Sequence, residues 1–265
     1  MQPSCEIILF GNEDGTAEIA AELGIKQVTA VERNEYGTPL ISSMFKIAQE
    51  MAGNELVCYV NADIILMSDF MQAIRQVRIK PFLMVGQRRD IDLNETLDCQ
   101  KADWEAKLKI RVDNEGRLHG VTGIDYFVFT KGLYNNMPPL AVGRPGWDNW
   151  LIYHTRFRKI PVIDATAMIT AVHQNHGHAD HPGGEKGFWE GPEAKRNVEL
   201  AGGRDHAFHI GFADWTLTPR GLHRARGWRS LYYRFRALPL LHPGLRFLLP
   251  LVKLPGKIVG VLRRT

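Results

Sequence analysis

The stretch Glu55–Leu66, ELVCYVNADIIL, most constrains the fold, because polar residues interrupt an otherwise apolar run. An apolar run rich in Val, Ile and Tyr is typical of a buried parallel strand. The run stops at Asn61-Ala62-Asp63 and then resumes. In open α/β sheets ligands bind just beyond the carboxyl ends of the strands, so a carboxylate there is positioned for a metal ion or a phosphate. Asp63 is equally compatible with capping the turn that follows.

Strands alternate with helices along the first part of the chain. Expected strands are Glu6–Phe10, Lys26–Val31, the stretch above and Pro81–Gly86. Expected helices are Thr16–Leu23, Leu40–Met51 and Ser68–Val77. This alternation predicts an α/β fold with a mostly parallel, doubly wound central sheet flanked by helices. Further on the pattern becomes α+β, with expected helices at Ala102–Arg111, from Trp147 and at Glu193–Leu200, and expected strands at Ile124–Thr130, Lys159–Asp164 and Phe212–Thr218.

Charge divides the 265 residues into a body, residues 1–219, and a tail, residues 220–265. The tail holds 11 Lys and Arg and no Asp or Glu, so the net charge of +4 splits into +11 for the tail and −7 for the body. Gly227–Ala237 and Leu245–Leu262 alternate basic with aromatic and Leu residues, which is typical of helices that lie in a lipid headgroup layer. We therefore expect the tail to bind an anionic membrane surface. A basic face packed on the body is the alternative, and nucleic acid is disfavoured because the body shows no matching basic groove.

Cysteine usage and hydropathy indicate where such a protein would work. Three scattered cysteines do not form a disulfide framework, which favours a reducing compartment. We see no signal peptide and no apolar run of the roughly 20 residues that a membrane span needs. The expectation is a cytoplasmic protein, peripheral on the inner face of the cell membrane.

The order of motifs carries a family resemblance. The elements follow in the order of a strand, Asn34-x-x-Gly37, a helix, a second strand and then Asn61-Ala62-Asp63. In this order the chain resembles the nucleotide-binding half of GT-A fold glycosyltransferases, in particular the family-2-like members of the nucleotide-diphospho-sugar transferase superfamily. In that family a D-x-D motif ends the strand and holds a metal on the donor diphosphate. Gly146–Trp150, GWDNW, looks like the late acidic motif that supplies the base in inverting members, and His173–His176, HQNH, looks like the histidine that completes some metal sites. The resemblance implies a GT-A-like, Rossmann-like sheet.

The same resemblance implies the roles of the reacting groups. Mn²⁺ or Mg²⁺ would be held by Asp63 with His173, and with His176 as second choice. Asp148 would be the general base for the acceptor hydroxyl; its alternative is favourable electrostatics at a helix N-terminus. Asn61 replaces the first Asp of D-x-D and brings no charge, so weak metal dependence stays open. The His-rich stretch lacks the motifs of a zinc site.

Further residues would bind the donor and the acceptor. The turn after Phe10 would contact the base of a UDP-sugar, Glu32, Asn34 and Gly37 the base or ribose, and Arg88 the phosphate or sugar. Asp125, together with the residues of the GWDNW motif, would contact sugar hydroxyls or the acceptor; these motif residues are Trp147, Asn149 and Trp150. The alternative for the charged nucleotide-site residues is an ordinary surface charge. For Asp125 it is a carboxylate at a strand edge, and for the two tryptophans it is packing in the core.

These residues predict an enzyme that moves a sugar from a nucleotide-diphosphate donor, UDP-linked, to a hydroxyl of a glycan or lipid-linked acceptor. A sugar-phosphate nucleotidyltransferase would share the sheet but needs a Lys-containing, Gly-rich loop after the first strand. The loop here, GNEDGTAE, has neither Lys nor Arg. A non-catalytic sugar- or nucleotide-binding module is the other alternative.

Overall fold

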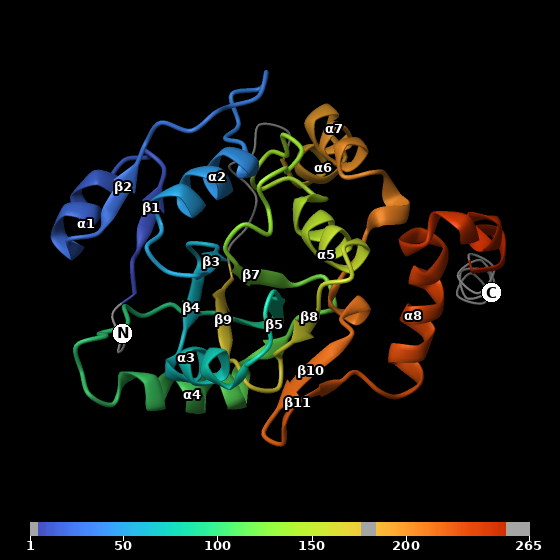
Figure 1. Cartoon of the computed structure of the whole chain (residues 1–265). Coiled ribbons are helices and arrows are strands. Elements are labelled where there is room, and N and C mark those ends of the chain that lie inside the picture. Colours follow the sequence, from blue (N-terminus) through green and yellow to red (C-terminus); the bar gives the residue numbers. More distant parts are fainter. Residues whose placement is uncertain (1–4, 176–183, 253–265) are drawn as a thin grey trace.

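The main sheet is built around its longest strand, β5 (Leu83–Ile91), at the centre of Figure 1. The computed structural model describes residues 5–175 and 184–252. The first half of β5 pairs with β8 (Val162–Asp164) in parallel and with β7 (Ile124–Thr130) in antiparallel orientation. Its second half pairs in parallel with β9 (Ala171–Gln174). β5 therefore belongs to two sheet regions, one at each of its ends.

The remaining strands extend these two regions. Along the main path the order is β11-β10-β8-β5-β7-β3, and β4 lies beside β9, antiparallel to it. The flanking strands are β3 (Leu56–Val60), β4 (Ile64–Leu66), β6 (Arg117–Leu118), β10 (Trp215–Thr218) and β11 (Gly221–Arg224). A separate two-stranded parallel sheet is formed by β1 (Ile8–Phe10) and β2 (Lys26–Val28).

Helices cover both faces of the sheet. The helices are α1 (Thr16–Leu23), α2 (Ile41–Met51), α3 (Ser68–Gln76), α4 (Trp104–Glu115), α5 (Trp147–Phe157), α6 (Gly184–Glu190), α7 (Pro192–Leu200) and α8 (Trp228–Leu241), with 3-10 turns η1 (Arg204–His206), η2 (Ile210–Phe212) and η3 (Pro243–Leu248). Alternate residues of a strand point to opposite faces, so β5 and β7 feed two cores. Leu83 and Val85 pack with α2 and α5, and Met84 packs with α3.

The α/β class is confirmed, but the predicted mostly parallel sheet is wrong in its pairing. β7 lies antiparallel between β3 and β5, so β3 pairs with β7 and ends the main path. β3, expected as a buried central strand, is only half-buried, and Cys58 and Val60 are exposed. β1 and β2 pair with each other rather than with β3. Periodicity identifies strands but does not specify their partners, which depend on long-range packing.

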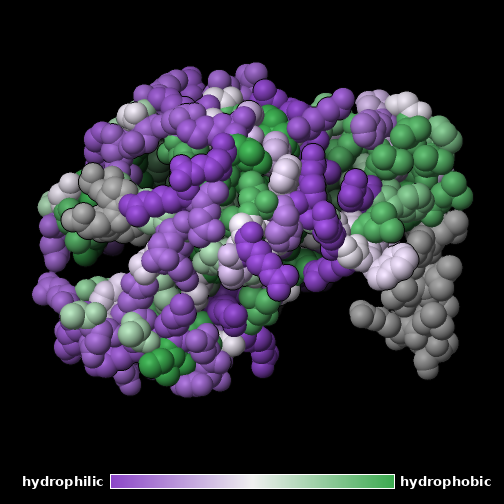
Figure 2. Space-filling model, turned by 60° about the horizontal axis from the view of Figure 1, so that its bottom comes forward, coloured by the Kyte–Doolittle hydropathy of each residue, from purple (hydrophilic) through white to green (hydrophobic). Residues whose placement is uncertain are grey.

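The predicted division at residue 219 falls in the turn of the β10–β11 hairpin, so the first residues of the tail belong to the main sheet. α8 follows and packs on η2, where the ring of Tyr233 lies 4.9 Å from that of Phe212. Figure 2 shows hydrophobic side chains gathered on the right-hand side of the molecule, where the C-terminal elements lie. No helix in the described part of the chain is long and apolar enough to cross a bilayer.

Candidate active site

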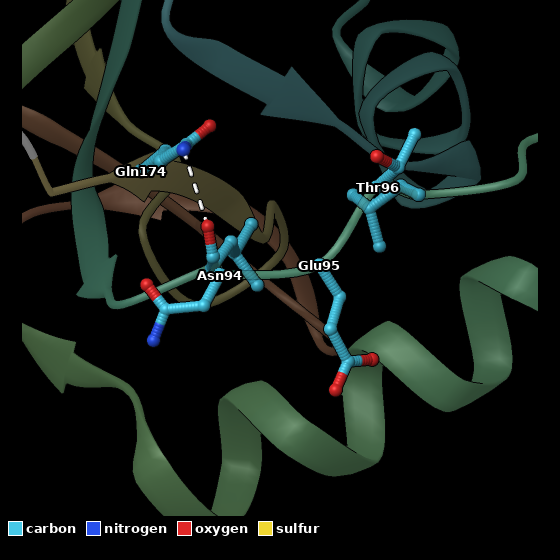
Figure 3. A pocket seen from close by; sticks show the side chains of 6 residues that line it. Asn94, Glu95, Thr96 and Gln174 are labelled. Atoms are coloured by element: carbon cyan, nitrogen blue, oxygen red, sulfur yellow. Dashed lines mark hydrogen bonds between the residues drawn. The ribbon is translucent and has the colours of Figure 1, made fainter.

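Two hollows are candidates for a site, and they differ in chemistry. The smaller, of about 380 Å³, is lined by Leu93–Leu97 and Gln174 (Figure 3). There Gln174 Nε2 donates to the carbonyl oxygen of Leu93, 3.2 Å away. Glu95 is its one titratable lining residue and is exposed. The larger, a cleft of about 1520 Å³, is bounded by β1, β3, α2 and the start of α5 and contains most of the predicted site.

The polar break at Asn61-Ala62-Asp63 forms the turn between β3 and β4 and lines the cleft. Asn61 donates from its backbone N–H to the Asp125 carbonyl at 3.0 Å and from Nδ2 to Asp125 Oδ1 at 2.7 Å. Its side chain is therefore bound to the start of β7. Asn61 therefore anchors this turn.

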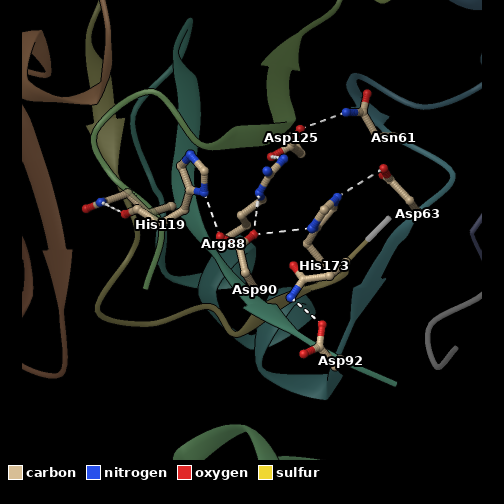
Figure 4. Close-up of polar contacts among 10 residues, drawn as sticks. Asn61, Asp63, Arg88, Asp90, Asp92, His119, Asp125 and His173 are labelled. Carbon is tan, nitrogen blue, oxygen red and sulfur yellow. Dashed lines mark hydrogen bonds and ion pairs between the residues drawn. The ribbon is translucent and has the colours of Figure 1, made fainter. Parts of the chain in front are cut away.

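Asp63 and His173 meet as the sequence predicted. β4 pairs antiparallel with β9, and the register sets Ile64 opposite His173. His173 Nε2 lies 3.3 Å from Asp63 Oδ2, on the cleft wall (Figure 4). His173 is buried, with 6% of its surface exposed. Strand pairing between segments more than 100 positions apart thus builds the predicted ligand pair.

Asp90 is the residue at this site that the sequence analysis missed. Its carboxylate accepts from Arg88 Nε at 2.8 Å, lies 2.6 Å from His119 Nδ1 and lies 3.2 Å from His173 Nδ1 (Figure 4). Burial alone would raise the pKa of Asp90, but the hydrogen bonds and charges of His119 and Arg88 hold it below its usual value. The available signal was the i, i+2 spacing of Arg88 and Asp90, which sets both on one face of a strand.

His173 therefore lies between two carboxylates, one at each ring nitrogen. Metal-bound histidines commonly have a carboxylate beside their other ring nitrogen. Asp90 would then orient His173 so that Nε2 faces the cleft beside Asp63.

The pair fits a divalent cation geometrically. Metal–oxygen distances of roughly 2.1 Å in an octahedral site set neighbouring ligand atoms about 3 Å apart, close to the 3.3 Å between His173 Nε2 and Asp63 Oδ2. In the part of the chain that the structure describes, no group of three or more His, Cys, Asp or Glu side chains is arranged to hold a metal ion. The protein would supply two ligands and a bound diphosphate or water the rest. His176, the second predicted ligand, lies outside the described residues.

Arg88 and Asp125 form a salt bridge, and both residues line the cleft. Arg88 Nη1 donates to Asp125 Oδ2 at 3.0 Å. Burial raises the pKa of Asp125, and the positive charge of Arg88 opposes that rise. A guanidinium has five N–H donors, so two bonds to carboxylates leave donors for a phosphate or sugar.

Asp148 occupies the first turn of α5, on the cleft wall. Gly146 precedes it with φ of 106°, a left-handed conformation that glycine adopts without strain and that turns the chain into the helix. Burial raises the pKa of Asp148 to about 6, against the lowering effect of nearby backbone N–H groups; the negative charge of Asp125 adds to the rise. A carboxyl with this pKa is suited to general acid–base chemistry.

Tyr59, on β3, is affected by all three cleft carboxylates. Burial raises its pKa, and the charges of Asp125, Asp63 and Asp148 raise it further. The three carboxylates and Tyr59 all line the cleft. Acidic groups from three separate parts of the chain converge on a single cleft.

The residues that flank Asp148 have different environments. Trp147 lines the cleft but is largely buried, with its ring 5.0 Å from Tyr59 and 5.2 Å from Phe127. Asn149 also lines the cleft, and its Nδ2 donates to the Phe208 carbonyl at 2.7 Å. Trp150 is not among the cleft residues and stacks on His154 at 4.4 Å. Trp150 is therefore a core residue, which was the alternative interpretation of the tryptophans.

Of the residues expected to bind the nucleotide, some line the cleft and others lie outside it. Phe10 and Ala62 line the cleft, whereas Glu32 and Gly37 do not. Asn34 is used within its turn: Oδ1 accepts from two backbone N–H groups, and Nδ2 donates to Glu193 at 2.7 Å.

Comparisons with models of protein families, with curated proteins and with solved structures found no match to this chain. What the site does is therefore inferred from its side chains and their geometry.

Proposed function

We propose that this chain is a glycosyltransferase of the GT-A type, which transfers a sugar from a UDP-linked donor to a hydroxyl of a glycan or lipid-linked acceptor. One observation carries the proposal. Asp63 with His173, and Asp148 with its raised pKa, line the same cleft from different elements. Asp63 and His173 are suited to hold a metal ion at the diphosphate of the donor, and Asp148 is suited to accept a proton from the acceptor hydroxyl.

The reaction displaces a diphosphate at the anomeric carbon of the sugar. The Asp148 carboxylate takes the proton of the acceptor hydroxyl while that oxygen forms the new bond to the anomeric carbon. The bond from that carbon to the donor phosphate oxygen breaks, and the nucleotide diphosphate leaves with the electron pair. Asp63 and His173 would hold Mn²⁺ or Mg²⁺, which would supply Lewis-acid stabilisation of the departing oxygens.

The surrounding residues would position these groups. Asp90 lies 3.2 Å from His173 Nδ1 and would orient that ring. Arg88 donates to Asp125, whose carboxylate would also hydrogen-bond sugar hydroxyls. The cleft volume of about 1520 Å³ exceeds the usual 300–1,000 Å³ of small-ligand pockets, which leaves room for donor and acceptor together. The loop after β1 brings Glu13 and no Lys or Arg, which disfavours the nucleotidyltransferase alternative.

Thermal denaturation with UDP, with Mn²⁺ and with both tests the proposal. A ligand that binds only the folded state at 100 times its Kd raises the melting temperature of a chain this size by roughly 5–10 °C. We expect this rise with UDP and Mn²⁺ together, and its loss in Asp63→Ala. Asp113→Ala removes an exposed carboxylate on α4 and is the matched control.

Release of UDP from a panel of UDP-sugars then distinguishes an enzyme from a binding module. Turnover that needs Asp148 supports the transferase. A metal-dependent shift that survives in Asp63→Ala would overturn the metal assignment, and binding without any turnover of a donor would favour the non-catalytic alternative.

A further inference from the structure

Helix α8 displays an apolar stripe on its outer side. The stripe occupies positions i, i+3, i+4, i+7 and i+10, which lie on one side of an α-helix; its members are Trp228, Leu231, Tyr232, Phe235 and Leu238. Trp228 is 87% exposed, Leu231 56% and Phe235 50%. Side chains of this kind are normally buried, so a row of them in solvent marks an interaction surface.

The opposite side of α8 holds the helix on the protein body. Ala237 is buried there, and the ring of Tyr233 packs 4.8 Å from His209 and 4.9 Å from Phe212. The stripe is therefore the outward face of a helix whose orientation is fixed by its own packing. Beyond α8, Phe247 and Leu251 are also exposed, at 71% and 55%.

Arginines border the stripe on both sides. At about 100° per residue, Arg229 and Arg236 fall on one flank of the stripe and Arg234 on the other. From Arg220 to the C-terminus the chain has no Asp or Glu. The surface combines an apolar centre with a positively charged border.

We propose that the α8 stripe docks in the plane of an anionic phospholipid surface. Its apolar side chains would enter the acyl boundary, and the bordering arginines would lie at the depth of the lipid phosphates. Charge complementarity selects this partner, since each basic residue near an anionic leaflet contributes about 1 kcal/mol. Nucleic acids are bound largely through contacts to their phosphates, whereas the centre of this surface is apolar. This inference is independent of the proposed transfer reaction.

Co-sedimentation of the full chain with lipid vesicles tests the inference. We expect binding to phosphatidylcholine vesicles that contain phosphatidylglycerol, weaker binding at high salt, and little binding to phosphatidylcholine alone. Trp228→Ser with Phe235→Ser should weaken binding roughly tenfold or more. Arg229→Gln with Arg234→Gln should weaken it by about 25-fold, at about fivefold for each charge.

Ile110→Ser on α4 is the matched control, because Ile110 is 63% exposed and lies away from the stripe. Unchanged melting temperatures would show that each variant folds. The inference is overturned if the full chain does not bind anionic vesicles, if neutral vesicles bind equally well, or if the stripe variants bind like the wild type. It is also overturned if light scattering finds a dimer that the stripe variants dissociate, because the stripe would then bind a second copy.

Discussion

Asp148 is the residue whose chemistry can be tested most directly. Its pKa of about 6 lies above the usual 3.8, so its ionisation opposes folding. The associated stability is present below about pH 4 and is lost as the pH rises through about 6. At pH 7 the carboxylate is therefore ionised and able to accept a proton. Its ionisation in this buried position lowers the free energy of unfolding.

Asp148→Asn should accordingly separate activity from stability. We expect turnover to fall by roughly 10²–10⁴-fold, the usual contribution of a general base. We also expect the free energy of unfolding at pH 7 to rise by up to about 3 kcal/mol, because a carboxyl whose pKa is raised by two units is removed. Urea unfolding at pH 4 and pH 7, beside transfer assays, measures both effects.

Asp113→Asn, on the exposed side of α4, controls for the change of charge alone and should alter neither quantity. The wild-type rate should also fall on acidification with an apparent pKa near 6. Loss of stability at pH 7 in Asp148→Asn, or a rate that Asp148→Asn leaves intact, would rule out the base assignment.

Asp90 should show the opposite pH dependence. Its pKa is held low in the folded state, so it stabilises the fold above about pH 4, and this stability is lost as the pH falls. Asp90→Asn should lower the free energy of unfolding at pH 7 by about 1.5–3 kcal/mol, the usual value of a hydrogen bond to a charged group. The difference from wild type should shrink toward pH 3. A difference that is equal at both pH values would indicate lost packing rather than lost charge.

At the scale of elements, β5 is constrained by the close approach of β7. A Cβ atom added to Gly86 would overlap the hydroxyl of Tyr126, which is fully buried. The register between β5 and β7 also shifts at this point, between Val85 and Gln87. Gly86 thus allows β5 to pass Tyr126 and continue to Arg88 and Asp90 at the site.

Gly86→Ala should lower the free energy of unfolding by about 1–3 kcal/mol, the usual cost of overpacking a core. Gly120→Ala is the matched control, because a Cβ at Gly120 meets no atom within 4 Å. Its effect should stay within about 0.5 kcal/mol. Chemical denaturation of both variants measures the difference, and equal stabilities would show that Tyr126 moves aside without penalty.

At the scale of the whole molecule, the β1–β2 sheet is separate from the main sheet, and the cleft is lined by residues of both sheets. Among the described strands, β1 pairs only with β2, and residues of both β1 and β3 line the cleft. A unit with few hydrogen bonds to the rest opens at lower free energy than a central strand. We therefore expect amides of β1 and β2 to exchange with solvent faster than those of β7.

UDP with Mn²⁺ should slow exchange in β1 and leave β7 nearly unchanged, because a ligand in the cleft would contact both of its walls. Hydrogen exchange followed by mass spectrometry makes the comparison, and Asp63→Ala should abolish the ligand effect. Protection of β1 that is equal to that of β7 without ligand would contradict this description of the molecule.

The sequence by itself determined the elements and most of the site's members. Helix α1 and strand β7 have the predicted bounds, because their residues carry local signals of helix and strand. The break at Asn61-Ala62-Asp63 was visible as polar residues in an apolar run. Periodicity, turns and polarity are local properties, so they can be read from the chain directly.

Only the tertiary structure decided how these parts meet. The insertion of β7 beside β5 moved β3 to the edge, and the pairing of β4 with β9 brought His173 to Asp63. Asp90 became the partner of His173 through the parallel pairing of β5 with β9. Strand pairing and side-chain contacts depend on residues far apart in the chain, and their free energies are realised only when the sheet is assembled.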